Sequence, residues 1–449
     1  MSLSRHLSFG PWKPCLRACG HRIARRWGAL LVPPLIGVGL VGMVGQATAQ
    51  GDALGSTLQG LLIHARAQSP EVGAMRQEAD AAAERVQSAG ALPDPILRVE
   101  LMNFNNYGNG GSVNLLPSQV GETKYTLMQA LPAWGKRDLR RDVADAQARQ
   151  AAARTDATWA ELAARIKAAY ADYFKIAGNE RLAREVLDLM ARLERVAQAR
   201  YAGGLGPQQD AIRAQLEQTA MRADLIVLES EKNQVKATLN ALLAREATAP
   251  LAEPASLRPL PSLSPADATT LIERARANNP QLKVEQAGLS GAQKNRELSL
   301  RNRYPDLLVG LSPSQMGSRI TTWGLMFEMN IPLQQASRRS QEREAEAMVQ
   351  AARSRVENAA NQLLGELAAK LAAFDSARRS EALVRSQLLP QSELSLQSAL
   401  AGYENGKVDF ATLLDAQRQI RKARQDLLKT QVEAQMRLAE IERLLGEDL

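Results

Sequence analysis

Residues that commonly perform catalysis are scarce in this chain of 449 residues. Both cysteines (Cys15 and Cys19) and two of the three histidines (His6 and His21) lie before residue 50, so the rest of the chain keeps only His64. Thiol chemistry, zinc sites and histidine triads therefore lack the residues they need there. That part also lacks the GxxxxGK[ST], HExxH, GxSxG and CxxC motifs. We expect no catalytic activity, no cofactor and no resident metal.

The carboxylates that remain of interest lie next to two glycine-containing turns. Asp210 follows Tyr201-x-x-Gly204, and Asp415 follows Tyr403-x-x-Gly406. The glycines allow backbone conformations that a β-carbon opposes. An acidic residue near a helix start stabilises the helix dipole or caps free amides, which is the simplest role for Asp210.

The first 49 residues have the pattern of a secretory signal. A basic stretch ends at Arg26, an apolar run covers 29–45, and Ala47-Thr48-Ala49 provides small residues at the cleavage spacing. We predict a signal peptide over 1–49, with an N-terminal membrane anchor as the alternative. The formal charge of +8 is concentrated in this segment, so we expect no nucleic-acid partner.

The rest of the chain contains an internal duplication. Four landmarks recur in the same order about 200 to 212 residues later. The pairs are 64–70 with 274–280, Pro93-Asp94 with Pro305-Asp306, Leu131-Pro132 with Ile331-Pro332, and 201–215 with 403–417. The pattern predicts one repeat over 50–248, a proline-rich linker over 249–265 and a second repeat over 266–449.

Each repeat is expected to contain a helix, two strands, a very long helix, a turn and a further helix. In the second repeat, the long helix should run from 336 to about 401 with a kink at Pro390. The predicted strands are 96–104, 122–131, 306–313 and 320–331, joined by loops at 105–121 and 314–319.

The predicted strands alternate between an apolar and a more polar face. Runs of about ten such residues suit a membrane β-barrel, although an amphipathic sheet in a soluble protein has the same pattern. Four strands cannot close a barrel, whereas three copies would provide twelve strands around a lumen. The residues expected to face lipid are Leu97, Val99, Leu101, Tyr125, Leu127, Trp323, Leu325, Phe327 and Met329.

Over nearly all of residues 50–449, the chain resembles the TolC-like outer-membrane efflux factors. The most specific motif runs from Gly402-Tyr403 to Asp415-Ala-Gln417. Length and the 131–137 stretch are most similar to the heavy-metal branch (CzcC and CusC relatives), although the lipidated cysteine common in CusC relatives is absent. The resemblance implies a mainly α-helical homotrimer with a shared twelve-stranded barrel in the outer membrane. It also implies a periplasmic helical tunnel, a periplasmic membrane-fusion adaptor and an inner-membrane RND pump.

The resemblance assigns expected roles to the residues at the turns. Asp415 matches a gate aspartate at the periplasmic aperture and Asp210 is its equivalent in the first repeat, whereas Thr412 and Val408 replace other charged gate positions. The expected function is efflux of heavy-metal cations. Alternatives are multidrug efflux, type I protein secretion, or a periplasmic coiled-coil adaptor or structural protein. The residues expected to form the turns and the adaptor-docking surface are Tyr201, Gly204, Gln215, Tyr403, Gly406 and Gln417.

Overall fold

The computed structural model of the protein describes residues 54–104, 113, 115–261 and 268–449. The predicted signal peptide, most of the loop at 105–121 and the end of the linker lie outside the described residues. Within the described part, no helix is both long and apolar enough to cross a membrane.

The described chain alternates helices with two β-hairpins, and the same order of elements occurs twice. The first repeat contains α1 (Leu58–Gln68), α2 (Pro70–Ala89), β1 (Ile96–Met102), β2 (Glu122–Leu131), α3 (Lys136–Ala202) and α4 (Gln208–Leu242). The second contains α5 (Ala268–Asn278), α6 (Pro280–Arg301), β3 (Leu307–Met316), β4 (Arg319–Met329), α7 (Gln335–Leu383), the π-helical turn η2 (Val384–Leu388), α8 (Leu389–Glu404) and α9 (Phe410–Leu445).

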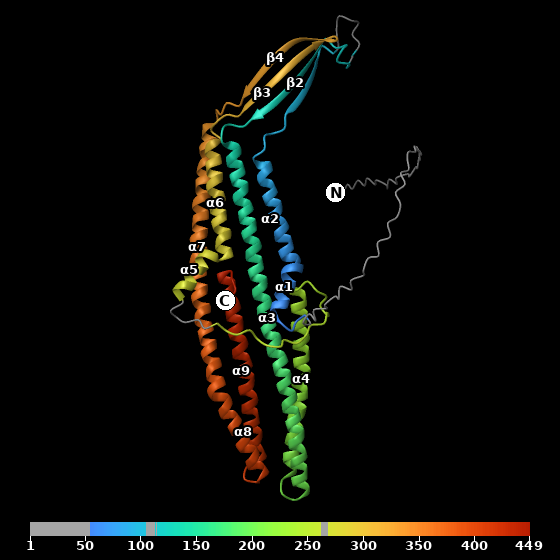
Figure 1. Ribbon diagram of the computed structural model, residues 1–449, viewed down its shortest axis with the longest axis vertical. Helices are drawn as coiled ribbons and strands as arrows, with labels where there is room; N and C mark the ends of the chain where they lie inside the picture. Colours follow the sequence, from blue (N-terminus) through green and yellow to red (C-terminus); the bar gives the residue numbers. More distant parts are fainter. Residues whose placement is uncertain (1–53, 105–112, 114, 262–267) are drawn as a thin grey trace, which may run out of the picture. The chain divides into compact units, whose positions relative to one another are not determined.

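The long helices pack side by side, and their neighbours change along the length of α3. Near the sheet, α2 and α6 pack against α3, and α7 packs against α6. Further from the sheet, α4 and α9 pack against α3, and α7 and α8 pack against α9 (Figure 1). With 67 residues at 1.5 Å per residue, α3 extends for about 100 Å. The helix therefore connects the sheet to the distant helical turns in one element.

Matching caps explain why both repeats begin with a broken helix. Ser69 accepts a hydrogen bond from the Val72 amide, and Pro70 occupies the first turn of α2. Asn279 and Pro280 do the same for α6. A capping side chain followed by proline ends one helix and starts the next, because proline needs no amide partner at that position.

The four strands form one antiparallel sheet in the order β1-β2-β3-β4. Each hairpin pairs within its own repeat, while β2 pairs with β3 and joins the two repeats. In the register, Leu127 lies opposite Leu311, and Leu131 lies opposite Leu307. The mainly α-helical fold with a small antiparallel sheet, predicted from the sequence, is confirmed.

The second hairpin turn is shorter than predicted, since β3 continues to Met316 and β4 begins at Arg319. The prediction of a loop over 314–319 was wrong. Gly317 has a φ of +59°, and its carbonyl accepts a hydrogen bond from the side-chain Nε2 of Gln315 at 2.7 Å, so two residues suffice for the turn. β3 continues past Pro313, which lies opposite Trp323 in the pairing with β4, and the register shifts between Ser314 and Gln315.

A π-helical turn interrupts the long helix that the sequence predicts over 336–401. The turn, η2, comes just before Pro390, which lies in the first turn of α8. A π-turn accommodates one extra residue, and this one lies where Pro390, which has no backbone N–H, leaves a carbonyl of the preceding turn without its usual donor. The discontinuity is therefore at 384–388, a few residues earlier than the proline itself.

A glycine in α8 provides a direct test of close packing at the α8–α9 turn. A β-carbon at Gly402 would lie 2.5 Å from Val408 Cγ2, whereas one at Gly365 in α7 would meet nothing within 4 Å. We expect Gly402→Ala to destabilise the protein by about 1–3 kcal/mol through overpacking. Gly365→Ala should instead stabilise it by about 0.5–1 kcal/mol, because alanine restricts the unfolded chain. Thermal unfolding in detergent measures both, and equal midpoints would contradict the packing at Gly402.

Candidate functional site

The two helical turns lie together at the end of the helices away from the sheet (Figure 1). Both turns use the same backbone geometry: Gly204 and Gly406 each have a φ of +71°. The Leu205 amide donates to the Arg200 carbonyl and the Lys407 amide donates to the Gly402 carbonyl, each at 2.8 Å. This pattern closes a helix with a left-handed residue, which explains the glycine in each Tyr-x-x-Gly motif.

Arg200 at the end of α3 connects the two turns. Its Nη1 donates to the carbonyls of Tyr403 and Glu404 at 2.9 and 3.2 Å, and its Nη2 donates to Leu205 at 3.2 Å. The guanidinium also lies 5.0 Å from the centre of the Tyr403 ring. Arg200 therefore fastens the last turn of α8 to the α3–α4 turn through a charged donor.

Tyr403 is the centre of the packing between the turns and is only 2% exposed. Its ring meets Phe410 edge-on at 5.3 Å, and its hydroxyl donates to Asp210 Oδ2 at 3.4 Å. Burial raises the pKa of Tyr403, the nearby Asp210 charge raises it further, and Arg200 partly opposes both. Tyr403 therefore remains a neutral donor, and Asp210 is its acceptor on the opposite hairpin.

The two predicted gate aspartates have different environments. Asp210 is buried in the first turn of α4 and does not cap it, since the N-cap residue is Pro207. Asp415 is exposed on α9. Asp409 caps α9 instead, accepting hydrogen bonds from the Thr412 amide and hydroxyl at 2.9 and 2.6 Å. Of the two predicted gate residues, only Asp415 is free to meet solvent in a single chain.

The remaining predicted turn residues divide between surface and interior. Tyr201 is half exposed, and Gln215 donates to Glu194 at 2.7 Å. Gln417 is buried, and its Nε2 has no hydrogen-bond partner among the described residues. Val408, which replaces a charged family position, packs against Gly402. Fewer of the predicted turn and docking residues are therefore exposed in one chain than the motifs alone suggest.

The sheet has one apolar face that extends across both repeats. Residues directly opposite each other in antiparallel strands share a face, and the register aligns the predicted lipid-facing residues. Leu97, Val99, Leu127, Trp323, Leu325, Phe327 and Met329 are exposed, while Leu101 and Tyr125 are partly buried. One row runs through all four strands: Leu97, Leu127, Leu311 and Leu325.

The opposite face of the sheet is mixed and contains the charged residues. Arg98, Glu100 and Lys124 lie there, and Arg98 and Glu100 form an ion pair at 3.8 Å. Met128 and Met326 lie on the same face and flank Gly310, where a β-carbon would come within 3.2 Å of either side chain. Packing around this glycine explains both methionines. Among the described residues, no three His, Cys, Asp or Glu side chains group as metal ligands would.

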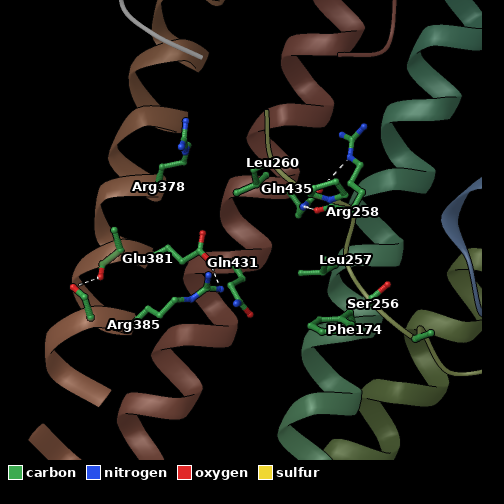
Figure 2. Close-up of a pocket in the computed structure, with 14 residues that line it drawn as sticks. Phe174, Ser256, Leu257, Arg258, Leu260, Arg378, Glu381, Arg385, Gln431 and Gln435 are labelled. Carbon is green, nitrogen blue, oxygen red and sulfur yellow. Dashed lines mark hydrogen bonds and ion pairs between the residues drawn. The ribbon is translucent and has the colours of Figure 1, made fainter. Parts of the chain in front are cut away.

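A buried charge cluster holds the linker against the middle of the long helices. Glu442 of α9 accepts hydrogen bonds from Lys167 of α3 at 2.8 Å and from both Nη atoms of Arg258 at 2.7 and 2.8 Å. Arg258 and Gln435 also bond to each other (Figure 2). Lys167 additionally contacts Asp448. The cluster thus joins both repeats, the linker and the C-terminal residues.

The linker forms one wall of an open cavity of about 700 Å³ (Figure 2). The other walls come from α3, α7, η2 and α9. Within the cavity, Arg385 pairs with Glu381 at 2.7 Å, and Arg378 donates to the Pro261 carbonyl at 3.3 Å. Because these cations already have protein partners, the cavity contains no obvious free charge for a ligand.

Lys136 connects the sheet to the helices. Its buried Nζ donates to Asp306 at 2.8 Å and to the Tyr304 carbonyl at 2.7 Å, and the Ala133 amide also donates to Asp306. Burial alone would raise the pKa of Asp306, but these hydrogen bonds and the Lys136 charge lower it below its usual value. The ionised Asp306 therefore stabilises the folded protein at any pH above the ordinary pKa of an unfolded aspartate. This stabilisation is lost as the pH falls through the lowered pKa of Asp306 in the folded protein.

The motifs did not reveal Arg200, Lys136, Glu442 or Arg258. Arg200 directly precedes Tyr201, but no pattern distinguishes it from many other arginines on helices. Asp306 belongs to a landmark of the duplication and Lys136 lies within the 131–137 stretch, and these positions were the available signal.

These features define a class: duplicated, mainly helical proteins with a small amphipathic sheet and paired helical turns, the fold of solved outer-membrane channels. The chain matches the outer membrane efflux protein (OEP) family over residues 61–245 and 271–447, one stretch in each half. The chain therefore belongs to the outer membrane efflux protein family, and the predicted TolC-like resemblance is confirmed.

Individual relatives agree with this assignment. The chain is 23% identical over 393 residues to the cobalt-zinc-cadmium resistance protein CzcC of Cupriavidus metallidurans, covering 87% of this chain and 90% of CzcC. Its fold is similar to the outer membrane protein VceC from Vibrio cholerae, with a TM-score of 0.72, 18% identity and coverage of 87% and 96% of the two chains. It is also similar to CusC, with a TM-score of 0.72, 16% identity and coverage of 87% and 92%. The family and fold are those of efflux channels rather than enzymes.

Proposed function

We propose that this protein is the outer-membrane duct of a tripartite efflux system and that it exports heavy-metal cations. The observation that carries the channel assignment is the apolar face that crosses all four strands and both repeats. Trp323, Leu325 and Phe327 are each more than 60% exposed on that face. An exposed apolar surface of this extent needs an apolar environment, and lipid fits the alternation of the strands.

The assembly follows from the edges of the sheet. β1 and β4 are the outer strands, each paired on one side only within the described chain. In lipid, unpaired backbone groups at such edges are too costly to persist, so several copies must share one barrel. Eight strands from two copies would enclose only side chains, whereas twelve from three copies leave a lumen. We therefore propose a homotrimer, and its mass in detergent measured by light scattering tests the proposal.

The proposed partners are a periplasmic membrane-fusion adaptor and an inner-membrane RND pump. The channel itself has no motif for coupling to an energy source. The paired turns offer the docking surface, with Tyr201 and Leu205 exposed and Arg200 fixing the turns relative to each other. A cysteine replacing Leu205 should form a disulfide with a cysteine-bearing adaptor in cells, while one replacing the buried Tyr403 should not.

The proposed cargo rests on the likeness to CzcC and CusC. A duct needs weak interactions so that ions leave as readily as they enter, so a dedicated metal cluster is not required. Deleting the gene should sensitise cells to divalent metals such as zinc, cobalt, cadmium or nickel, or to monovalent copper or silver. Sensitisation to dyes, detergents or antibiotics alone would favour multidrug efflux, and loss of a secreted protein would favour type I secretion.

Asp415 is proposed to line the periplasmic aperture, where the copies from three chains would converge. Asp415→Asn removes the charge with little change in shape and should lower cation selectivity, because fixed like charges at a narrow mouth concentrate cations. Reversal potentials in planar bilayers under a salt gradient measure the effect. Asp80→Asn, which changes an exposed aspartate of α2 away from the turns, is the control. Unchanged selectivity for Asp415→Asn would show that this carboxylate does not line the mouth.

A further inference from the structure

Exposed aromatic and apolar side chains gather where the sheet meets the helices. Trp134, between β2 and α3, is 93% exposed, and Tyr304, between α6 and β3, is 54% exposed. On the β4 side, Ile331 and Leu333 are 62% and 83% exposed. Tryptophan and tyrosine combine an apolar ring with a polar group, which suits the boundary between hydrocarbon and water.

The guanidinium of Arg301, at the end of α6, has no acidic partner among the described residues and lies near both Tyr304 and the backbone next to Trp134. Arg301 stacks over the Tyr304 ring at 5.4 Å, and a β-carbon at Gly135, next to Trp134, would lie 3.2 Å from its Nη2. Within the described residues, Arg301 has neither an ion pair nor a side-chain hydrogen bond, although it is partly buried. An arginine held in this way can offer its planar fork to a phosphate.

Two nearby carboxylates are already neutralised by other cations. Lys136 pairs with Asp306, and Arg303 forms a bidentate pair with Glu342. Arg140, close enough to lower the pKa of Asp306, adds a further positive charge on α3. Asp94 and Asp138 are exposed there without ion pairs in the described part of the chain, but Arg137, Arg140 and Arg301 outnumber them. The junction therefore keeps a positive surface beside its apolar residues, which is complementary to anionic headgroups.

The helices that carry these residues are central in the protomer. α3 and α6 pack against each other, with α2 packed on α3 and α7 packed on α6. A neighbouring copy would meet the flanking helices first, so Trp134 and Arg301 are not placed at an edge that such a copy would cover. A lipid therefore fits this exposed position better than a second chain does.

We propose that Trp134, Tyr304 and Arg301 form a binding site for the phosphate headgroup of an anionic phospholipid in the leaflet next to the helices. The aromatic rings lie at the headgroup level, and Arg301 holds the phosphate against them. Lys136 fixes Tyr304 relative to Trp134. Its Nζ donates to the Tyr304 carbonyl at 2.7 Å, and Lys136 is only two residues after Trp134 in the chain. This proposal rests on the proposed channel function, since it requires the apolar sheet face to lie in lipid.

The test uses two variants of the whole protein, each retaining one tryptophan, reconstituted in phosphatidylcholine vesicles containing phosphatidylglycerol. All other tryptophans are replaced by phenylalanine. Lipids brominated near the headgroup should quench Trp134, and lipids brominated deep in the acyl chain should quench Trp323. If Trp323 is quenched while Trp134 stays open to aqueous iodide, the headgroup site is wrong and the channel proposal stands. If aqueous iodide quenches both Trp134 and Trp323, the headgroup site and the channel proposal are both wrong.

The charge contribution is tested by brominating only the phosphatidylglycerol. We expect this lipid to be enriched about fivefold beside Trp134 over its bulk share, as one arginine near an anionic surface would produce. Arg301→Gln should return it to the bulk share, while Arg353→Gln, an exposed arginine far along α7, should leave the enrichment unchanged. Equal quenching in the variant that retains only Trp134 and in the same variant carrying Arg301→Gln would overturn the role of Arg301.

Discussion

Replacing Glu442 with alanine is expected to destabilise the protein by about 3–5 kcal/mol, the usual cost of removing one partner from a buried ion cluster. The substitution leaves Arg258 without its bidentate carboxylate and Lys167 without a buried partner. The Glu442 side chain is only 2% exposed, so water cannot replace the lost contacts without opening the structure. The midpoint of denaturant unfolding, followed by circular dichroism in detergent, measures the loss.

A matched control is available on the same helix. Glu433 pairs with Arg437 at 3.6 Å on the surface, and Glu433→Ala should change stability by no more than about 0.5 kcal/mol. Replacing Lys167 with methionine and Glu442 with leucine together should recover part of the loss, because the buried Lys167 charge is removed with its partner and only Arg258 still lacks its carboxylate. Equal stability of Glu442→Ala and Glu433→Ala would mean that the cluster does not hold the linker in place.

Replacing Arg200 with alanine is expected to release the paired turns from each other. The variant loses charged hydrogen bonds to Tyr403, Glu404 and Leu205, and a charged bond of this kind contributes about 1.5–3 kcal/mol. Loss of one such contribution would raise the ratio of released to fastened turns about 10- to 100-fold. Amide hydrogen exchange over 199–208 and 402–410 should accelerate accordingly, and single-channel conductance in planar bilayers should rise.

Arg195 provides the comparison for this variant. Arg195 is exposed on the same helix, and its only side-chain bond within the described residues is to the carbonyl of Ala191. Arg195→Ala should leave exchange at the turns and conductance unchanged. Tyr403→Phe should also accelerate hydrogen exchange at the turns and raise the conductance, but less than Arg200→Ala does. It removes only one long hydrogen bond, the one to Asp210. If Arg200→Ala and Arg195→Ala behave alike, the turns are held by packing alone.

The sequence determined the repeats, the turn glycines and the strand faces, because these depend on local rules. The break that divides the first helix of each repeat in two also follows from local rules, but a single helix was predicted there. Pro70 and Pro280 end one helix and begin the next through their covalent geometry, and Gly204 and Gly406 close helices through a positive φ. Alternation along each strand likewise assigns a side to each residue without knowledge of its neighbours. The same local reasoning failed at 314–319, where the pairing of β3 with β4 carried the strand past Pro313.

Only the tertiary structure decided which distant residues meet. Pairing of β2 with β3 unites the two repeats in one sheet, and nothing in either strand specifies that partner. Arg200 reaches across to Tyr403, and Glu442 collects cations from α3 and the linker. Asp210, equivalent to Asp415 by motif, is buried against Tyr403 while Asp415 is exposed. Side-chain type and spacing fix local geometry, whereas burial and pairing of charges depend on how long helices align over many turns, which the sequence pattern does not encode locally.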